Sequence, residues 1–474
     1  MTAAWTSDPV AIAEAQARAA GVPPGRRFEL TDAGNGERFA HRHGSVFRFD
    51  HDQGRWLRSD GRRWALDACR SVVAAAIATA RSMYSEAAGA GRDEAARLAA
   101  HAHRSESAGR LKAMLELASV NAQIARCTRD FDRDPMLLNV ANGTVDLRTG
   151  EMYAARQGDL LTKLAPVAFD PAVTCPTWIA FLTWAFRSDT EVLDWVKQIC
   201  GYTLTGRVDA QAWFFLHGQG RNGKTTFLEA LERILGDYAT RAMPDLLLAK
   251  ALDQHPTELA DLQGSRMVLC IEPDLGRRFR DGLLKALTGE SRLKARRMHR
   301  DPFTFDVTSK LFVAANYKPE VRDASDGFWR RVQLVPFEAQ VEDGDANPVL
   351  GEKLHAEAPG ILAWCVQGCL AWQQLGALLR PASVAGATQA YRDEQDHLRR
   401  FVDEACLVAP RAWAASGAVF AEYTRWCARS GEEPLSRLLF AQLLERQAGI
   451  CPRRTKTARG WQGLAVRSQV TGDA

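Results

Sequence analysis

The sequence predicts an α/β protein whose central element is a parallel sheet with a phosphate-binding loop at one edge. Two observations predict this class. Short apolar runs of strand length, bounded by turn or charged residues, occur at 212–216, 265–271, 309–316 and 332–337. The first run leads into a glycine-rich turn and then into a pattern of helical spacing, which is the order strand, loop and helix that a phosphate-binding loop requires. We therefore expect the rest of the chain to be arranged around residues 211–235.

The turn has the full G-x-x-x-x-G-K-[ST] pattern, GQGRNGKT. Its glycines allow backbone N–H groups to point at phosphate oxygens, and the helix behind it places its N-terminus at the same point. Lys224 is expected to reach the β and γ phosphates, and Thr225 to hold Mg²⁺. ATP and Mg²⁺ are thus the predicted ligands. The residues predicted to contact the nucleotide are Gly218, Gly220, Asn222, Gly223, Lys224, Thr225 and Thr226.

Polar residues follow two of the other predicted strands. The strand at 265–271 ends in Glu272-Pro273-Asp274, and an acid at that position can support Mg²⁺ and activate water, so Glu272 is the first candidate and Asp274 its helper. The alternative is a solvated acidic turn. Asn316 ends the next strand and could orient a water molecule at the γ phosphate.

A basic stretch lies between these strands. Residues 285–300 contain six Lys or Arg and one acid, Glu290. With the turn that it contains, the stretch could form a hairpin directed at a nucleic-acid backbone, although a run of charge is often only a solvated face.

Two arginines, Arg330 and Arg331, stand directly before the fourth strand. An arginine at a subunit edge could stabilise charge on the phosphate that a neighbouring subunit holds. The alternative for either residue is a structural arginine paired with a carboxylate.

The flanking parts have their own patterns. Residues 1–25 read as a tail and linker; a hairpin at 47–57 and helices at 67–88 and 93–125 follow, and 142–150 reads as turn, strand and turn. His41, His43, His101 and His103 are expected at the surface rather than as metal ligands.

The C-terminal part begins with helices through residue 378 and at 385–407. Two further helices (418–430 and 436–448) and a strand-like end then have the order of a winged helix. Residues 411–467 hold ten Lys or Arg against four acids, which favours DNA binding over protein contacts.

Bulk properties exclude some classes. The net charge of 474 residues is +4, so a nucleic-acid surface must come from local clusters. The ten cysteines show no zinc spacing, and reduced thiols favour the cytoplasm. No run has the length of a membrane span, so no membrane partner is expected.

In this order, the motifs resemble the superfamily 3 helicases, specifically the phage, plasmid and poxvirus primase-helicase group, over residues 28–466. The resemblance rests on Gly201 to Gly206, Asn222 to Thr225, Glu272, Leu287-Thr288-Gly289, Asn316, Trp329-Arg330-Arg331 and Pro336-Phe337. It implies an N-terminal domain at 26–165, an AAA+-like ATPase core with helical flanks at 176–380, and a C-terminal helix and winged-helix domain at 381–474. It also implies that Glu272 is the second nucleotide-site acid, Asn316 the sensor and Arg331 the finger, with Arg330 as the competitor. Lys294, Arg296, Arg297 and His299 would lie on or near the DNA-facing hairpin.

Two departures from the group qualify what it implies. The group usually has Gly-Gly-Asp after the threonine, where this chain has Gly289-Glu290-Ser291, which weakens the expectation for the hairpin's DNA contacts. Only a short tail precedes Phe28, so no primase site of its own is expected, and a separate primase or polymerase would supply priming.

The expected function is an ATP-dependent DNA helicase of a mobile element, a homo-oligomer of hexameric type that moves on single-stranded and forked DNA. The alternative from another class is an ATP-switched origin-binding or loading protein without processive unwinding. A weaker third interpretation is a small-molecule kinase, which would need neither a basic hairpin nor a winged helix.

Overall fold

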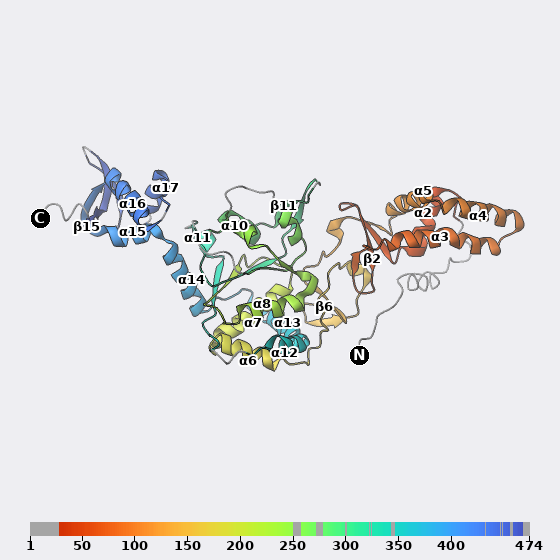
Figure 1. The fold of residues 1–474 in the computed structure, drawn as a ribbon, viewed down its shortest axis with the longest axis horizontal. Coiled ribbons are helices and arrows are strands. Elements are labelled where there is room, and N and C mark those ends of the chain that lie inside the picture. The colour runs from red at the N-terminus through yellow and green to blue at the C-terminus, as the bar shows by residue number, and fades with distance from the viewer. Residues whose placement is uncertain are drawn as a thin grey trace.

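The computed structural model describes residues 28–249, 257–271, 278–298, 301–321, 323, 325–342, 347–431, 433–445, 447, 449–455 and 458–467. Figure 1 shows a helical N-terminal unit at one end, a central unit built on a sheet, and a smaller C-terminal unit at the other end. The predicted tail at 1–25 lies outside the described residues.

The N-terminal unit packs helices around a small antiparallel sheet. The predicted hairpin is confirmed, because Phe47 pairs with Arg58 across its two strands. The helix predicted at 93–125 is instead two helices that turn at Glu106, because α5 folds back onto α2, where a Cβ on Gly36 would lie only 3.0 Å from Leu117 Cβ. The helix α2 was not predicted. The elements are α2 (Asp32–His43), β1 (Phe47–Asp50), β2 (Arg55–Ser59), β3 (Trp64–Leu66), α3 (Ser71–Ala88), α4 (Arg92–Ser105) and α5 (Ala108–Ser119).

Two of the histidines predicted at the surface are buried in this unit. His43 is 2% exposed and its Nε2 lies 3.0 Å from Thr79 Oγ1, while His101 is 6% exposed and its Nε2 lies 3.0 Å from Asn35 Oδ1. Burial lowers the pKa of both side chains. The surface prediction was wrong for these two because their hydrogen-bond partners come from other helices and are invisible to local spacing.

A connecting segment leads from this unit into the central one. It contains β4 (Ala125–Arg126), η1 (Thr128–Asp130), β5 (Leu137–Val140), β6 (Gly143–Asp146), β7 (Glu151–Tyr153) and η2 (Gln157–Asp159). The predicted turn, strand and turn at 142–150 is confirmed by β6. Leu138, Val140, Val145 and Leu147 are fully buried in the hydrophobic core of the central unit. Residues that the sequence groups with the N-terminal domain therefore pack with the central sheet.

The central sheet is parallel and has five strands in the order β14-β8-β13-β10-β9. All four predicted strands are present. Phe214 and Leu216 point to one core and Trp213 and Phe215 to the other, so apolar side chains cover both faces. The strands are β8 (Trp213–His217), β9 (Ala239–Arg241), β10 (Met267–Ile271), β13 (Lys310–Ala315) and β14 (Val332–Pro336).

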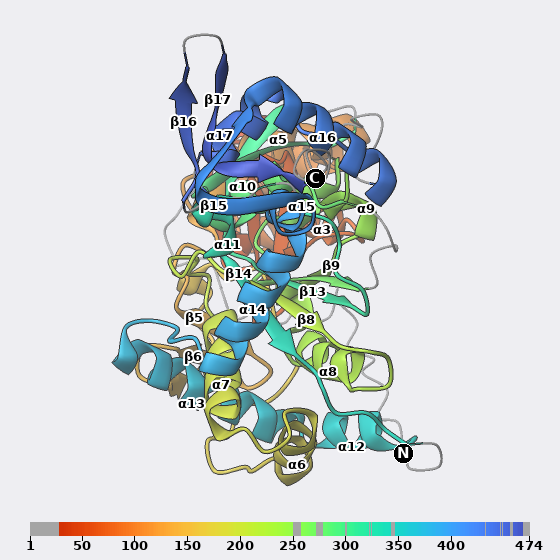
Figure 2. The same ribbon diagram turned by 90° about the vertical axis from the view of Figure 1, so that its left-hand side faces the viewer.

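Helices cover both faces of this sheet (Figures 1 and 2). The helices α7 and α13 pack closely, because a Cβ on Gly201 would lie 2.0 Å from the backbone N of Cys369. The predicted hairpin of the basic stretch is confirmed by β11 and β12, which pair antiparallel. The remaining elements are α6 (Pro176–Ala185), α7 (Thr190–Leu204), α8 (Lys224–Leu235), η3 (Gly236–Tyr238), α9 (Pro244–Leu247), η4 (Thr257–Leu262), α10 (Asp281–Gly289), β11 (Arg292–Arg296), β12 (Pro302–Asp306), α11 (Asp326–Trp329), α12 (Leu350–Ala356) and α13 (Ala358–Leu375).

The C-terminal unit has its own hydrophobic core. The single helix predicted at 385–407 is broken at Asp396, whose carboxylate caps the second helix by accepting from Arg399 N at 2.9 Å. The strand β15, which was not predicted, pairs with β17, and the β16–β17 hairpin projects from the unit (Figure 2). The elements are α14 (Ala382–Gln395), α15 (His397–Ala405), β15 (Cys406–Ala415), α16 (Ser416–Ser430), α17 (Arg437–Leu444), β16 (Cys451–Arg454) and β17 (Arg459–Val466).

Acid should destabilise the N-terminal unit through His43. Burial, with a smaller effect of Arg42, lowers the pKa of His43 from 6.5 to about 4. The unfolded chain therefore binds the proton first, and up to about 3 kcal/mol of stability is lost as the pH falls from about 6.5 to about 4. We expect His43→Gln, which can still donate to Thr79, to flatten this part of the profile. Urea unfolding at pH 7 and pH 5, with hydrogen exchange of α2 and α3, measures it; an unchanged pH slope in the variant would refute the assignment.

Candidate functional site

The loop between β8 and α8 is held in one conformation by close contacts. A Cβ on Gly218 would lie 2.1 Å from Phe337 O, and Gly223 has a φ of +85° and would place a Cβ 2.7 Å from the ring of Phe181. A side chain at Gly218 would displace the backbone of Phe337, and one at Gly223 would be strained by its positive φ and would have to displace the ring of Phe181. A Cβ on Gly220, in contrast, would have no atom within 4 Å, so this glycine faces open space.

Two hydrogen bonds, one from a side chain and one between backbone groups, connect the loop to the segment after β14. Asn222, which is 2% exposed, donates from Nδ2 to Phe337 O at 3.1 Å. The backbone N of Val341 donates to Arg221 O at 3.0 Å. Because the amide of Asn222 is buried, its hydrogen bond ties the loop to the edge strand of the sheet.

Lys224 is the first residue of α8, and the fold directs its ammonium back across the loop. Its Nζ donates to Gly218 O at 2.6 Å, Asn222 Oδ1 at 2.9 Å and Asn316 Oδ1 at 2.9 Å, and the residue is 6% exposed. Asn316 follows β13, which lies directly beside β8. The structure therefore brings together Lys224, Asn222 and Asn316, which the sequence had singled out separately.

An open cavity of about 190 Å³ lies over this cluster. Residues 220–226 form one side of it, and Ile271 and residues 314–316 form the other. Gly223 is the N-cap of α8 and offers no side-chain acceptor to the first N–H groups of the helix. Those N–H groups and the ammonium of Lys224 suit the oxygens of a phosphate chain, and Thr225 and Thr226 line the same cavity.

The predicted acids Glu272 and Asp274 lie outside the described residues. Ile271, the residue before Glu272, lines the cavity, so the carboxyl end of β10 faces the loop. His217, which the sequence did not single out, ends β8 beside the loop, and its pKa is lowered to about 4 by burial and by Lys318 and Lys224. It is neutral at physiological pH and adds no charge to the site.

The two arginines before β14 lie at the amino ends of the sheet strands, whereas the loop lies at their carboxyl ends. Val332 pairs with Trp213, the first residue of β8, whereas Gly218 follows the last. A strand of this length spans about 17 Å, so neither arginine can reach the loop of its own chain.

Arg330 and Arg331 differ in their surroundings. Arg331 donates from Nε to Gly327 O at 3.0 Å and from Nη1 to Lys285 O at 3.1 Å and to Thr288 Oγ1 at 3.2 Å. Burial and the charge of Arg330 lower its pKa. Arg330 is exposed and contacts Gln211 Oε1 at 3.3 Å. Arg331 is thus tied to α10, whereas Arg330 extends into solvent.

The β11–β12 hairpin presents a basic face. Along β11, Arg292, Lys294 and Arg296 are exposed, while Leu293 and Ala295 are buried against the central unit. Arg297 lies over the ring of Phe303, with 5.6 Å from Cζ to the ring centroid, and 3.9 Å from Asp261. The predicted His299 lies outside the described residues. The alternation of charged and apolar residues, visible in the sequence, accounts for the exposed face.

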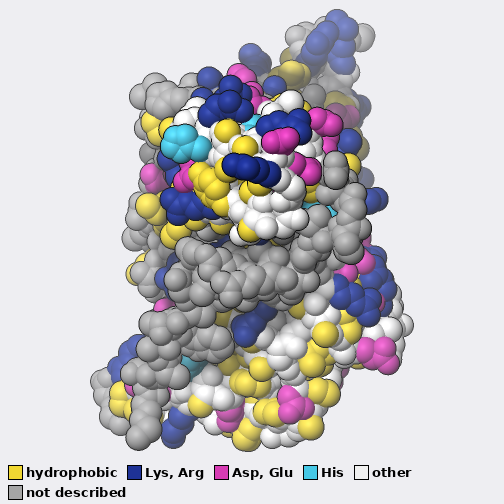
Figure 3. Space-filling view, turned by 90° about the vertical axis from the view of Figure 1, so that its right-hand side faces the viewer, with side chains coloured by type: hydrophobic (Ala, Val, Ile, Leu, Met, Phe, Trp, Pro, Cys, Tyr) yellow, Lys and Arg dark blue, Asp and Glu magenta, His cyan; other side chains and the backbone are white. Residues whose placement is uncertain are grey.

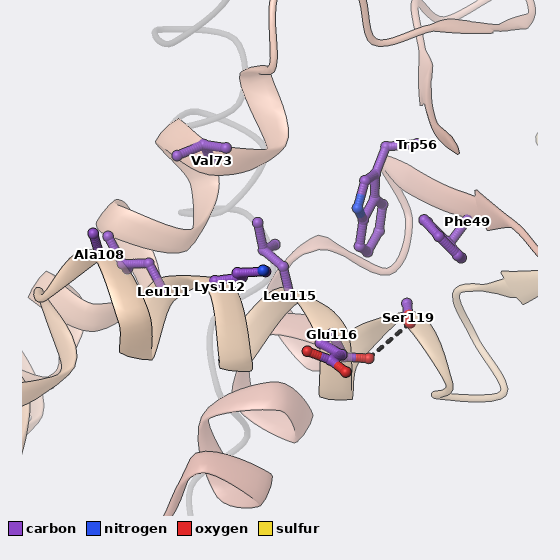
Figure 4. Close-up of a pocket in the computed structure, with 9 residues that line it drawn as sticks. All are labelled: Phe49, Trp56, Val73, Ala108, Leu111, Lys112, Leu115, Glu116 and Ser119. Atoms are coloured by element: carbon purple, nitrogen blue, oxygen red, sulfur yellow. Dashed lines mark hydrogen bonds between the residues drawn. The ribbon is translucent and has the colours of Figure 1, made fainter. Parts of the chain in front are cut away.

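A larger hollow in the N-terminal unit has a different character (Figure 4). Its volume is about 670 Å³, and apart from Lys112, Glu116 and Ser119 its lining is apolar, with Trp56 and Phe49 at one end. It offers no cluster of phosphate ligands. Within the described ranges there is also no group of three metal-ligating side chains and no helix long and apolar enough to cross a membrane.

Two protein families match parts of this chain. Residues 36–187 match the family described as "D5 N terminal like", and residues 216–331 match a family of unknown function (DUF5906). The second match includes the glycine-rich loop between β8 and α8, the basic hairpin and both arginines.

Several viral proteins are similar in sequence. Protein 022R of frog virus 3, named a helicase, is 28% identical over 374 residues, which is 74% of this chain and 36% of the relative. Protein L207/L206 of Acanthamoeba polyphaga mimivirus, also named a helicase, is 24% identical over 58% of this chain and 31% of the relative. Protein C962R of African swine fever virus, named a primase, is 23% identical over 70% of this chain and 38% of the relative. The matched stretches thus span about a third of each of these relatives.

One solved structure covers most of the fold. The apo structure of the NrS-1 C-terminal region (305–718) aligns with 88% of this chain and 96% of that chain, at a TM-score of 0.50 and 9% identity. At this identity the likeness concerns the fold alone.

Alanine substitutions at the two loop glycines should differ in their effect on stability. Gly223→Ala should cost about 1–3 kcal/mol, because the new Cβ disfavours a positive φ and meets Phe181. Gly220→Ala should change the free energy of unfolding by less than about 0.5 kcal/mol, because its Cβ meets nothing. Thermal unfolding midpoints of the two variants compare them, and equal midpoints would show that the loop is not held as described.

Proposed function

Because this chain belongs to the phage and poxvirus type of primase-helicase family, we propose that it works as an ATP-dependent DNA helicase during replication of a mobile element. Its relatives are named helicases and primases of large DNA viruses, which supports an enzyme of DNA replication.

The observation that carries the proposal is the arrangement around Lys224. A buried ammonium held by Gly218 O, Asn222 Oδ1 and Asn316 Oδ1 stands at the N-terminus of α8, next to helix N–H groups without a side-chain cap. A phosphate chain can replace those neutral oxygens with charged ones. The parallel sheet with this loop after β8 supports an AAA+-like ATPase core.

Each candidate residue has a proposed role in hydrolysis. The ammonium of Lys224 exchanges its contacts with protein oxygens for the β and γ phosphates. The backbone of Gly218, Gly220, Asn222 and Gly223 surrounds these phosphates, and Thr226 lies beside them. Thr225 and Glu272, helped by Asp274, would hold Mg²⁺, which when bound neutralises charge that develops on the phosphates. Asn316, released from Lys224, orients the attacking water, and Glu272 accepts its proton.

The finger must come from another subunit, because both arginines lie about 17 Å from the loop of their own chain. The surroundings favour Arg330 as the residue that reaches the neighbour's phosphates, since its side chain is exposed. Arg331 acts as the anchor: it joins the finger segment to Lys285 O and Thr288 Oγ1 at the end of α10, which continues into β11. A shift at the finger would thus be transmitted to the basic hairpin.

The same proposal includes a ring of subunits, of hexameric type, that surrounds single-stranded DNA. Lys294, Arg296, Arg297 and His299 would contact the strand from the hairpin, and the exposed face of β11 supports this. The C-terminal unit, with its projecting β16–β17 hairpin, would act as a winged-helix DNA-binding domain, and a separate primase or polymerase would act alongside the ring.

A second candidate function is an ATP-switched origin-binding or loading protein. The exposed strand β16, with Arg453 and Arg454, favours it, because this basic hairpin could hold duplex DNA without unwinding. Strand separation on a forked substrate decides between the two: ATP turnover without unwinding favours the switch. Stimulation of turnover by single-stranded DNA separates both from a small-molecule kinase.

Removing the ammonium should abolish turnover. We expect Lys224→Ala to lower the rate of ATP hydrolysis by at least about 100-fold, because it removes the buried positive charge at the N-terminus of α8. Lys353→Ala, which removes an exposed lysine of α12, is the matched control and should hydrolyse ATP normally. Steady-state phosphate release measures both, and substantial turnover by Lys224→Ala would refute the site.

Mixing inactive subunits tests whether the arginine acts between subunits. Arg330→Ala should bind nucleotide nearly normally but fail to hydrolyse it. Mixed with Lys224→Ala subunits, it should regain partial activity, because some interfaces then combine an intact loop with an intact arginine. Arg331→Ala is measured in parallel, and we expect it also to lower thermal stability through its lost contacts with α10. A mixture that stays inactive, or an Arg330→Ala protein that hydrolyses ATP normally, would overturn the arrangement.

A further inference from the structure

A second large cleft, about 820 Å³ in volume, lies between the N-terminal unit and the central unit. One wall is formed by the β1–β2 turn, residues 128–135 and residues 162–163. The other is formed by η4 and the β11–β12 hairpin, which lies on the side of the central unit toward the N-terminal unit (Figure 1). The two walls belong to different hydrophobic cores, so the cleft is created only by the way the units are joined.

The acidic side chains that line the cleft are engaged within the chain. Asp50 accepts from Thr128 Oγ1 at 2.8 Å, and Asp52 accepts from Thr128 N at 2.9 Å. Asp132 accepts from Thr162 N at 2.8 Å. On the hairpin side, Asp306 pairs with Arg292 at 2.8 Å and Asp261 lies 3.9 Å from Arg297. The contacts of Asp50, Asp52 and Asp132 hold the N-terminal wall in shape, and Asp306 and Asp261 lie beside the arginines of the hairpin.

Three cations of the N-terminal wall differ from these acids in their contacts. Across the described residues, Arg129, Arg133 and Lys163 make no side-chain hydrogen bond and no ion pair within 4 Å, although all three line the cleft. Lys163 is half-buried. Its pKa is lowered by burial and by the positive charges of Arg55, Arg63 and Arg266, which together outweigh the attraction of Asp132. An anion bound in the cleft would further stabilise this half-buried ammonium among other cations.

The opposite wall continues these charges toward the basic hairpin. Arg292 and Arg297 line the cleft, and both are paired with exposed acids, contacts of the kind that contribute little and can be exchanged for phosphate. From Arg292, the exposed face of β11 leads to Lys294 and Arg296. The cations thus follow a path from one unit to the other rather than forming a single point site.

We propose that this cleft binds the phosphate backbone of single-stranded DNA and leads the strand to the β11–β12 hairpin. The proposal rests on the proposed function, because it gives the DNA of the central channel a binding path on the N-terminal unit. A row of cations on two walls suits a flexible strand, whose phosphates can follow the path one after another.

The end of the N-terminal unit provides a matched control surface. Viewed along the long axis of the molecule, it mixes Lys and Arg with Asp and Glu rather than gathering one charge (Figure 3). Arg92, Arg104 and Lys112 are exposed on its helices α4 and α5 and, within the described chain, likewise make no side-chain hydrogen bond or ion pair. The triple substitution Arg92→Ala/Arg104→Ala/Lys112→Ala therefore removes the same charge from the same unit away from the cleft.

The experiment compares the cleft triple variant Arg129→Ala/Arg133→Ala/Lys163→Ala with wild type and this control. Binding of a fluorescent oligothymidine is measured by anisotropy over a range of salt, with a nonhydrolysable ATP analogue present. Each phosphate contact on single strands contributes about 0.7 to the slope of log K against log salt, so the cleft variant should lose about 2 from that slope and the control none. The double variant Arg129→Ala/Arg133→Ala, which leaves the half-buried Lys163 in place, should lose about 1.4. ATP hydrolysis without DNA should be unchanged in all variants.

The outcomes separate the cleft from the proposed function. An unchanged slope in the cleft variants, or an equal loss in the control, would overturn the cleft while leaving the helicase proposal in place. A wild-type protein that hydrolyses ATP but binds no single-stranded DNA would refute both. Cross-linking of a 4-thiothymidine oligonucleotide should label peptides of residues 128–135 and 292–308, and labels confined to other peptides would also contradict the path.

Discussion

The structure of the candidate site depends on one buried hydrogen bond, from Asn222 Nδ2 to Phe337 O at 3.1 Å. It fastens the glycine-rich loop between β8 and α8 to the segment that leaves β14, and Asn222 Oδ1 at the same time accepts from Lys224. A buried amide with both ends satisfied is rigid, because losing either partner would leave an unpaired polar group. The loop is therefore shaped before any ligand arrives, and binding need not order it.

Lys224 makes hydrogen bonds in this loop that an anionic ligand could replace. Its Nζ donates to Gly218 O, Asn222 Oδ1 and Asn316 Oδ1, and these hydrogen bonds stabilise a buried ammonium. An anionic ligand gives stronger, charge-assisted hydrogen bonds than these oxygens do. Because one of the three oxygens belongs to Asn316, ligand binding and the release of that amide are coupled through the same ammonium.

The order of the strands decides at which end of the sheet the other candidate residues lie. Because β13 lies between β8 and β10, the carboxyl ends of all three strands meet beside the loop. Arg330 and Arg331 lie at the opposite, amino ends of the strands. Under the proposed function, a site divided in this way is completed by the arginines of a second subunit. The contacts of Arg331 with the end of α10 then connect these arginines to the β11–β12 hairpin, and the packing of residues 136–169 in the central core holds the N-terminal unit beside it.

The sequence alone determined the features that depend on contiguous residues: the glycine-rich loop between strand and helix, the apolar strands of the central sheet, and the alternation that makes β11 basic on one face. Local backbone geometry and side-chain periodicity decide these features, and both can be followed along the chain. Only the tertiary structure decided what depends on partners distant in sequence: the burial of His43 and His101, the breaks at Glu106 and Asp396, the tie of Arg331 to α10, and the cleft with Arg129, Arg133 and Lys163. Each arises from which faces of separate elements meet, and no local pattern contains that information because hydrophobic burial is non-directional.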